Sequence, residues 1–120
     1  MTRSNQLRER ADRPLIITVD APEWDIASCE AFEELLIPAH DHPDVVIDLS
    51  NVSFMDSSCL HKIANVFRER VVKRGLRPAR LVIAKSPVRR LFQIVRFNRI
   101  WPIYATLEEA LRAGPAIQAS

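Results

Sequence analysis

The sequence is poor in glycine and cysteine, and it contains no long apolar run. Its 120 residues include two glycines and two cysteines, and we see no glycine-rich loop of the kind that cradles phosphates. Two cysteines cannot build the disulfide framework of a small secreted domain, and a reducing compartment disfavours a bridge between Cys29 and Cys59. No apolar run approaches the roughly 20 residues of a membrane-spanning helix. The polar N-terminal segment also lacks the apolar stretch of a signal peptide, so we expect a cytoplasmic protein.

The composition is typical of one globular domain. Hydrophobic residues make up 48% of the chain and charged residues 27%, with a net charge of +2, which is unlike a disordered chain. The charge is unevenly spread, because residues 1–60 carry 4 basic and 12 acidic side chains (−8) and residues 61–120 carry 13 and 3 (+10). The basic residues fall on several expected elements without interleaved aromatic residues, so we expect no direct DNA binding. We expect the two halves to interleave in the fold and neutralise each other.

Apolar periodicity predicts strands that alternate with helices. We expect strands at 15–19, 45–49, 80–84 and 100–105, and helices at 26–39, 57–74, 86–95 and 107–113. Pro102 argues for an edge position of the last strand. Alternation of this kind predicts an α/β domain, with a central mixed sheet and helices packed mainly on one face. We assign the domain to residues 14–113, with a flexible leader at 1–13 and a flexible tail at 114–120.

The most informative segment is 54–60, between the strongest predicted strand and the longest helix. In open α/β folds, ligands and partners bind at this edge of the sheet. Asp56 or Ser57 can cap the helix, and a phosphate on a serine here would lie beside free backbone N–H groups. It would also add about −1.5 to −2 charges close to Asp56 and so repel a partner that docks there. The residue types alone favour a simpler alternative, a helix cap without further function.

The same segment carries a family resemblance. Residues 45–58 read VVIDLSNVSFMDSS and are followed by Leu60. Further matching pieces are Glu23-Trp24-Asp25 upstream and, downstream, Gly75, LVIA at 81–84, SPVRRLF at 86–92 and TLEEAL at 106–111. Together they resemble STAS domains over roughly residues 14–113. The resemblance is strongest to the stand-alone anti-sigma-factor antagonists of bacteria.

The resemblance implies a STAS-like fold and a partner-switching regulator of transcription. In that family the serine directly after the aspartate, which matches Ser57, is phosphorylated by a cognate anti-sigma factor with serine kinase activity. The unphosphorylated protein binds this anti-sigma factor and frees a sigma factor, and a PP2C-type phosphatase resets it. We expect the partner to contact Asp25, Asp56, Ser57, Ser58, Cys59 and His61. We find no nucleophile with an orienting base and no acid–base pair, so we expect neither enzyme activity nor a cofactor or metal.

Cys59 departs from the family pattern, which has glycine at this position. Glycine lets a partner approach the backbone closely, and Cys59 adds bulk there. A thiol at a helix N-terminus is also a potential redox sensor. Because we see no resolving cysteine, we interpret Cys59 as a small residue in place of glycine. The glycine common before the acidic turn is also replaced, by Ala21-Pro22.

Other interpretations stay open. Four side chains are potential zinc ligands, although their spacings match no common structural site: His40, His42, Cys59 and His61. A basic group could face an acidic protein partner, although a solvated helix face is simpler: Arg89, Arg90, Arg96 and Arg99. Some STAS-like proteins are fixed subunits of a lipid-transport ATPase or a stress-signalling complex, in which Ser57 would need no phosphate. An exposed edge strand would allow a weak homodimer.

Overall fold

The computed structural model describes residues 13–115. The leader expected at 1–13 and the tail expected at 114–120 therefore lie outside the described residues, except for Arg13, Gly114 and Pro115. No helix within the described range is long and apolar enough to cross a membrane.

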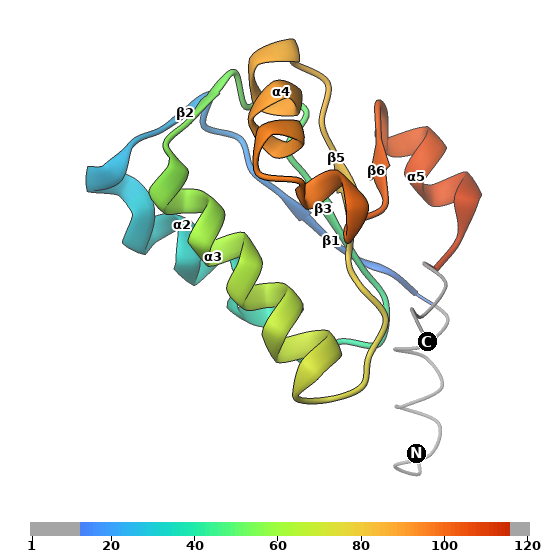
Figure 1. The fold of residues 1–120 in the computed structure, drawn as a ribbon. Coiled ribbons are helices and arrows are strands. Elements are labelled where there is room, and N and C mark those ends of the chain that lie inside the picture. The colour runs from blue at the N-terminus through green and yellow to red at the C-terminus, as the bar shows by residue number, and fades with distance from the viewer. Residues whose placement is uncertain (1–12, 116–120) are drawn as a thin grey trace, which may run out of the picture.

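A four-stranded sheet forms the centre of the domain (Figure 1). In the order β1-β3-β5-β6, its strands are β1 (Leu15–Thr18), β3 (Val45–Asp48), β5 (Arg80–Val82) and β6 (Ile103–Tyr104). The expected alternation with helices is confirmed, and β6 lies at an edge, as Pro102 indicated. Every described pairing in this sheet is parallel rather than mixed. The reason is that each strand reaches the next one through a helical crossover, which makes the two strands parallel.

Helices fill the connections between these strands. α2 (Cys29–Leu36) lies between two short 3-10 turns, η1 (Ile26–Ser28) and η2 (Ile37–Ala39). α3 (Ser57–Phe67) continues into a π-helical turn, η3 (Arg68–Val72). Gly75 follows with a φ of 65°, the left-handed conformation that favours glycine after a helix. α4 (Ser86–Ile94), the 3-10 turn η4 (Phe97–Arg99) and α5 (Leu107–Ala113) complete the described chain.

Apolar side chains cover both faces of the sheet. The larger core joins one face to α2, α3 and α4 and includes Ile47, Phe32, Ile63 and Phe92. The smaller core joins the other face to α5 and includes Val46, Val82 and Ala110. Because neighbouring residues of a strand point to opposite faces, Val46 and Ile47 belong to different cores. Three helices thus share one face and α5 covers the other (Figure 1), which confirms that the helices pack mainly on one face.

The acidic and basic halves of the sequence meet in the fold. Lys62 of α3 lies 2.9 Å from the carboxylate of Glu33 in α2, and Arg80 of β5 lies 2.7 Å from that of Asp44. The expectation that the two halves interleave is therefore confirmed. Arg70 is also fully buried, and its guanidinium donates to backbone carbonyls on both sides of it in the sequence, those of Ala39, His42, Pro43 and Arg77.

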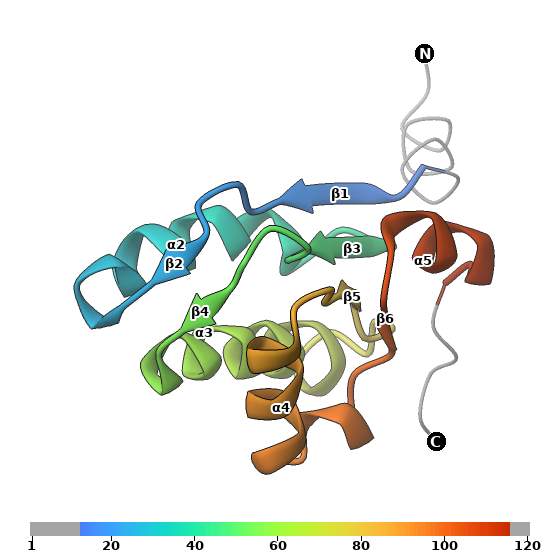
Figure 2. The same cartoon turned by 90° about the horizontal axis from the view of Figure 1, so that it is seen from above.

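A second, two-stranded ladder lies outside the main sheet (Figure 2). β2 (Glu23–Trp24) and β4 (Phe54–Met55) pair in parallel, with Glu23 opposite Phe54 and Trp24 opposite Met55. Neither segment is among the strands predicted from the sequence. Two residues are too few for the alternation that signals a strand.

Candidate functional site

The ladder of β2 and β4 brings two helix starts together. Trp24 pairs with Met55, and the backbone N–H of Asp56 donates to the carbonyl oxygen of Trp24 (2.8 Å). Asp25 follows β2 and begins the turn that leads into α2, while Asp56 follows β4 and begins α3. The two acidic residues thus lie at the same end of one ladder.

Asp56 is the N-terminal cap of α3. Its Oδ1 accepts a hydrogen bond from the backbone N–H of Ser58 (2.9 Å) and another from the Ser58 hydroxyl (2.7 Å). Both hydrogen bonds stabilise the charged carboxylate, so the pKa of Asp56 lies below its ordinary value of 3.8. A fixed negative charge therefore stands directly before Ser57.

Asp25 caps the turn before α2. Its Oδ1 accepts from the backbone N–H of Ser28 (3.0 Å), and the Ser28 hydroxyl accepts from the backbone N–H of Asp25 (3.0 Å). This reciprocal pair is a capping box. Asp25 is exposed, so it adds a second carboxylate to the surface at this edge.

The two serines at the start of α3 differ in what their hydroxyl groups contact. Ser58 is half-buried; its hydroxyl donates to Asp56 and lies 2.8 Å from the sulfur of Cys29. Ser57 is the first residue of α3 and is exposed. Within residues 13–115, its hydroxyl has no hydrogen-bond partner. Ser57 is therefore the serine that can be modified without loss of a structural hydrogen bond.

The backbone donors of the first turn are already occupied in part. The N–H of Ser58 binds the Asp56 carboxylate, and the N–H of Cys59 donates to the Asp56 carbonyl oxygen (2.9 Å). A phosphate on Ser57 would thus meet a competing carboxylate rather than a set of free donors. Its main physical effect would be the added negative charge.

The side chain of Cys59 points into the domain, whereas the resemblance implied that it contacts the partner. It is fully buried, and its sulfur lies 3.2 Å from that of Cys29. Burial, together with the hydrogen bond and charge of Cys29, raises the pKa of Cys59 to about 12. The side chain fills the space between α3 and α2 and is not presented to a partner, which corrects the expected contact.

A small apolar pocket opens next to Ser57. It has a volume of about 260 Å³ and is lined by side chains of α3 and of the chain just after α4: Ser57, Leu60, His61, Ala64, Val95 and Phe97. His61 is exposed and lies one helical turn after Ser57. Ile94, which precedes the pocket residue Val95, is itself 70% exposed. Ser57 thus stands at the rim of an apolar surface.

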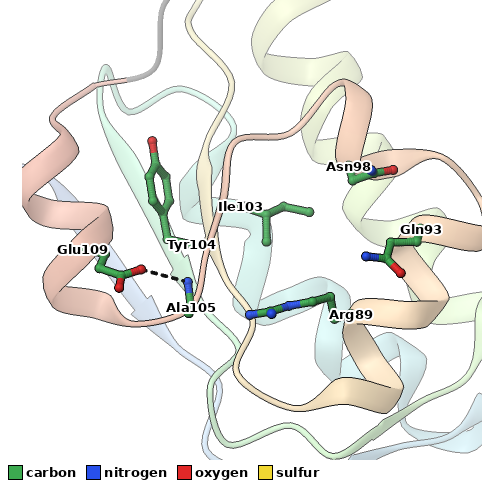
Figure 3. Close-up of a pocket in the computed structure, with 7 residues that line it drawn as sticks. All are labelled: Arg89, Gln93, Asn98, Ile103, Tyr104, Ala105 and Glu109. Carbon is green, nitrogen blue, oxygen red and sulfur yellow. Dashed lines mark hydrogen bonds between the residues drawn. The ribbon is translucent and has the colours of Figure 1, made fainter.

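A larger cavity of about 420 Å³ lies elsewhere, between α4 and the segment from β6 to α5 (Figure 3). Its lining includes one basic and one acidic side chain, and both already have partners. Arg89 Nη2 donates to the Ile83 carbonyl (2.9 Å), and Glu109 Oε2 accepts from the Ala105 N–H (3.4 Å). This cavity shares no lining residue with the pocket beside Ser57.

The potential zinc ligands named above do not form a metal site in the part of the chain that the structure describes. Among residues 13–115, no three His, Cys, Asp or Glu side chains come together as a metal site requires. Instead, His42 Nδ1 accepts from the N–H of Asp44 (3.1 Å), and Cys59 contacts Cys29. The basic group considered for an acidic partner is exposed at each position: Arg89, Arg90, Arg96 and Arg99.

Sequence reasoning missed Cys29 as a member of this site. Cys29 is the first residue of α2, and its sulfur contacts both Ser58 and Cys59. The signal available was that both cysteines lie within one turn of a predicted helix start. The ladder that brings those helix starts together was not predicted, so the two cysteines could not be paired.

Comparison with known proteins establishes the family. The sequence model of the STAS domain matches residues 6–110. The chain belongs to the STAS domain family. A comparison with curated proteins gave no match.

Solved structures with this fold include two proteins whose names describe a regulatory role. An anti-sigma factor antagonist from Mycobacterium paratuberculosis is 27% identical with a TM-score of 0.68, and the match covers 82% of each chain. An anti-sigma-factor antagonist (STAS) domain protein from Planctomyces limnophilus is 22% identical with a TM-score of 0.67, and the match covers 77% of this chain and 80% of the other. The second similarity establishes the fold alone.

Proposed function

We propose that this STAS-domain protein is an anti-sigma-factor antagonist. It binds an anti-sigma factor with serine kinase activity while Ser57 is unphosphorylated, and phosphorylation of Ser57 releases that partner. The protein is then a substrate and a binder rather than an enzyme. It would act in the cytoplasm, in the control of transcription, and a PP2C-type phosphatase would reset it.

The observation that carries this proposal is the contrast between Ser57 and Ser58. Ser57 is exposed at the start of α3, while the Ser58 hydroxyl is held by Asp56 and Cys29. A kinase needs a hydroxyl group that can reach its active site, and only the first of these two serines offers one. Ser58 instead supports the cap on which the local backbone depends.

The surroundings of Ser57 explain how a phosphate would act as a switch. The neighbouring apolar pocket and the exposed Ile94 offer surface that a partner can bury. A phosphate would add about −1.5 to −2 charges at the rim of that surface, beside the charged Asp56. Burying these charges against a partner is costly unless they are paired. On this proposal the partner contacts Asp25, Asp56, Ser57 and His61. Ser58 acts through its hydrogen bond to Asp56.

The test combines phosphorylation with binding. The full chain is incubated with ATP and each candidate anti-sigma kinase, and intact mass is measured for wild type, Ser57→Ala and Ser58→Ala. We expect one phosphate on wild type and Ser58→Ala and none on Ser57→Ala. Phosphorylated wild type should bind the kinase at least about tenfold more weakly, because unfavourable charge contacts cost more than about 1.4 kcal/mol.

Two results would contradict the proposal. One is a phosphate that remains on the Ser57→Ala variant, which would move the acceptor elsewhere. The other is stable binding to a partner that is unchanged by phosphorylation of Ser57. Binding of that kind would instead assign the protein to the fixed STAS subunits.

A further inference from the structure

The two cysteines of the chain meet at the edge that carries Ser57. Cys29 opens α2, and Cys59 lies in the first turn of α3. Their sulfur atoms are 3.2 Å apart, and both cysteines are free thiols. A disulfide bond measures about 2.05 Å, so the sulfurs need to approach by little more than 1 Å to be joined.

We propose that Cys29 and Cys59 are a redox-active pair that a hydroperoxide converts into an intramolecular disulfide. The bond would fasten the start of α2 to the start of α3. Cys29 is the second thiol that the sequence alone did not pair with Cys59, and in the steps below Cys59 resolves the oxidised Cys29. The pair does not depend on whether Ser57 is phosphorylated.

Burial of the two side chains sets the order of the steps. Cys29 is 7% exposed and Cys59 is 0% exposed, so a small oxidant reaches Cys29 first. Two oxygen acceptors lie within reach of the Cys29 thiol proton, the Ser58 hydroxyl at 2.8 Å from Sγ and the Asp25 carbonyl at 3.4 Å. Cys59, with its pKa raised to about 12 by burial, keeps its proton until the second step.

The chemistry balances with a hydroperoxide as the oxidant. The Cys29 sulfur attacks one oxygen, the O–O bond breaks, and the thiol proton leaves with the other oxygen as water or an alcohol, which yields a sulfenic acid on Cys29. The Cys59 sulfur then attacks the Cys29 sulfur. The S–S bond forms, the S–O bond breaks, and the hydroxyl group leaves as water with the Cys59 proton. The two thiols lose two electrons in total, and the hydroperoxide gains them.

Formation of the bond would change the contacts at the start of α3. One or both sulfurs must move to close the 3.2 Å gap, and Cys29 would no longer have a thiol proton to share with the Ser58 hydroxyl that it now contacts. Ser58 would keep its hydrogen bond to Asp56. The bond would also close a loop that contains β3 and β4, which restricts the unfolded chain. The oxidised protein should therefore unfold at a higher urea concentration than the reduced protein.

The experiment treats the reduced full chain with one equivalent of hydrogen peroxide. Free thiols are then alkylated under denaturing conditions, and intact mass is measured. We expect wild type to lose two hydrogens, to resist alkylation at both cysteines, and to recover both thiols with dithiothreitol. No lysine or arginine lies between residues 14 and 61, so trypsin leaves both cysteines in one peptide. A protease that cuts at acidic residues locates the bond instead.

Single variants separate the two steps. Cys59→Ala should stop at a sulfenic acid on Cys29 that dimedone traps, while Cys29→Ala should react far more slowly. Ser57→Ala should form the bond as wild type does, which keeps this test apart from that of the proposed function. Cysteine-to-serine variants replace any alanine variant whose circular dichroism departs from wild type.

Three outcomes would overturn the proposal. The first is a wild-type protein that retains both alkylatable thiols at a dose that oxidises Cys29 in Cys59→Ala. The second is a product linked only between two chains. The third is wild-type Cys29 that proceeds to sulfinic acid without an S–S bond.

Discussion

Nη2 of Arg80 lies 2.7 and 2.9 Å from the two carboxylate oxygens of Asp44, inside the domain. Arg80 is 1% exposed and Asp44 is 9% exposed. Nη1 of the same guanidinium donates to the carbonyl oxygen of Ala110 in α5. One side chain of β5 therefore holds both the start of β3 and the helix on the far face of the sheet.

Replacing Asp44 by alanine should destabilise the domain strongly. The substitution leaves the buried guanidinium of Arg80 without its counter-charge, which typically costs about 3–5 kcal/mol. Unfolding in urea, followed by circular dichroism, measures the change. Glu108→Ala is the control, because its ion pair with Arg112 is exposed and such pairs contribute little. Equal effects of the two variants would contradict the assigned role of the buried pair.

The two serines at the start of α3 should differ in their effect on stability. Ser58→Ala removes the hydrogen bond to Asp56 and the contact with Cys29, and should lower the free energy of unfolding by about 1 kcal/mol. Ser57→Ala removes no such hydrogen bond within the described range and should unfold like wild type. The comparison also shows whether Ser57→Ala fails to be phosphorylated because it lacks the acceptor hydroxyl or because it is less stable than wild type. A destabilised Ser57→Ala would mean that its hydroxyl has a structural partner.

Asp56 should make the stability depend on pH below the ordinary carboxylate range. The folded state lowers the pKa of Asp56 below 3.8 through its hydrogen bonds with Ser58, so the folded state binds this proton less readily than the unfolded state does. The stabilisation is complete above pH 3.8 and is lost as the pH falls through the lowered folded-state pKa. Urea unfolding from pH 5 downward should show a smaller decline for Asp56→Asn, which keeps an acceptor for the Ser58 N–H but has no carboxylate. A decline identical to that of wild type would argue against this role for Asp56.

Cys59→Gly, which restores the residue usual in the family, should be less stable than Cys59→Ala. Both substitutions remove the buried sulfur, and glycine adds a helix-propensity cost of about 1 kcal/mol relative to alanine. Because Cys59 is fully buried, both variants should bind the partner of the proposed function equally well. Urea unfolding measures the first comparison and calorimetric titration the second. Tighter binding by the glycine variant would show that the partner approaches the backbone at this position.

The regular elements of the fold could be predicted because their apolar periodicity is strong. The strand predicted at 45–49 is observed at Val45–Asp48, and the helix predicted at 107–113 is observed at those residues. Its cap, Thr106, accepts from the N–H of Glu109. Local residue preference and final packing agree in these segments, which is the condition under which a sequence pattern is reliable.

The features that could not be predicted depend on contacts between distant parts of the chain. The β2–β4 ladder is two residues long on each side and becomes recognisable only when both segments are placed side by side. The contact between Cys29 and Cys59 follows from that ladder. Arg70 resembles a solvated helix residue in sequence, yet backbone carbonyls from two separate segments surround its guanidinium. Composition and spacing do not encode such partners.

The π-helical turn at Arg68–Val72 has a consequence for comparing this chain with its relatives. The N–H of Lys73 donates to the carbonyl oxygen of Arg68, five residues earlier, so the turn holds one residue more than an α-helical turn. An alignment with a relative whose third helix is regular to its end therefore needs a one-residue gap within this turn. If the gap is placed elsewhere, the intervening positions shift by one, and buried residues such as Arg80 can be matched to the wrong counterparts.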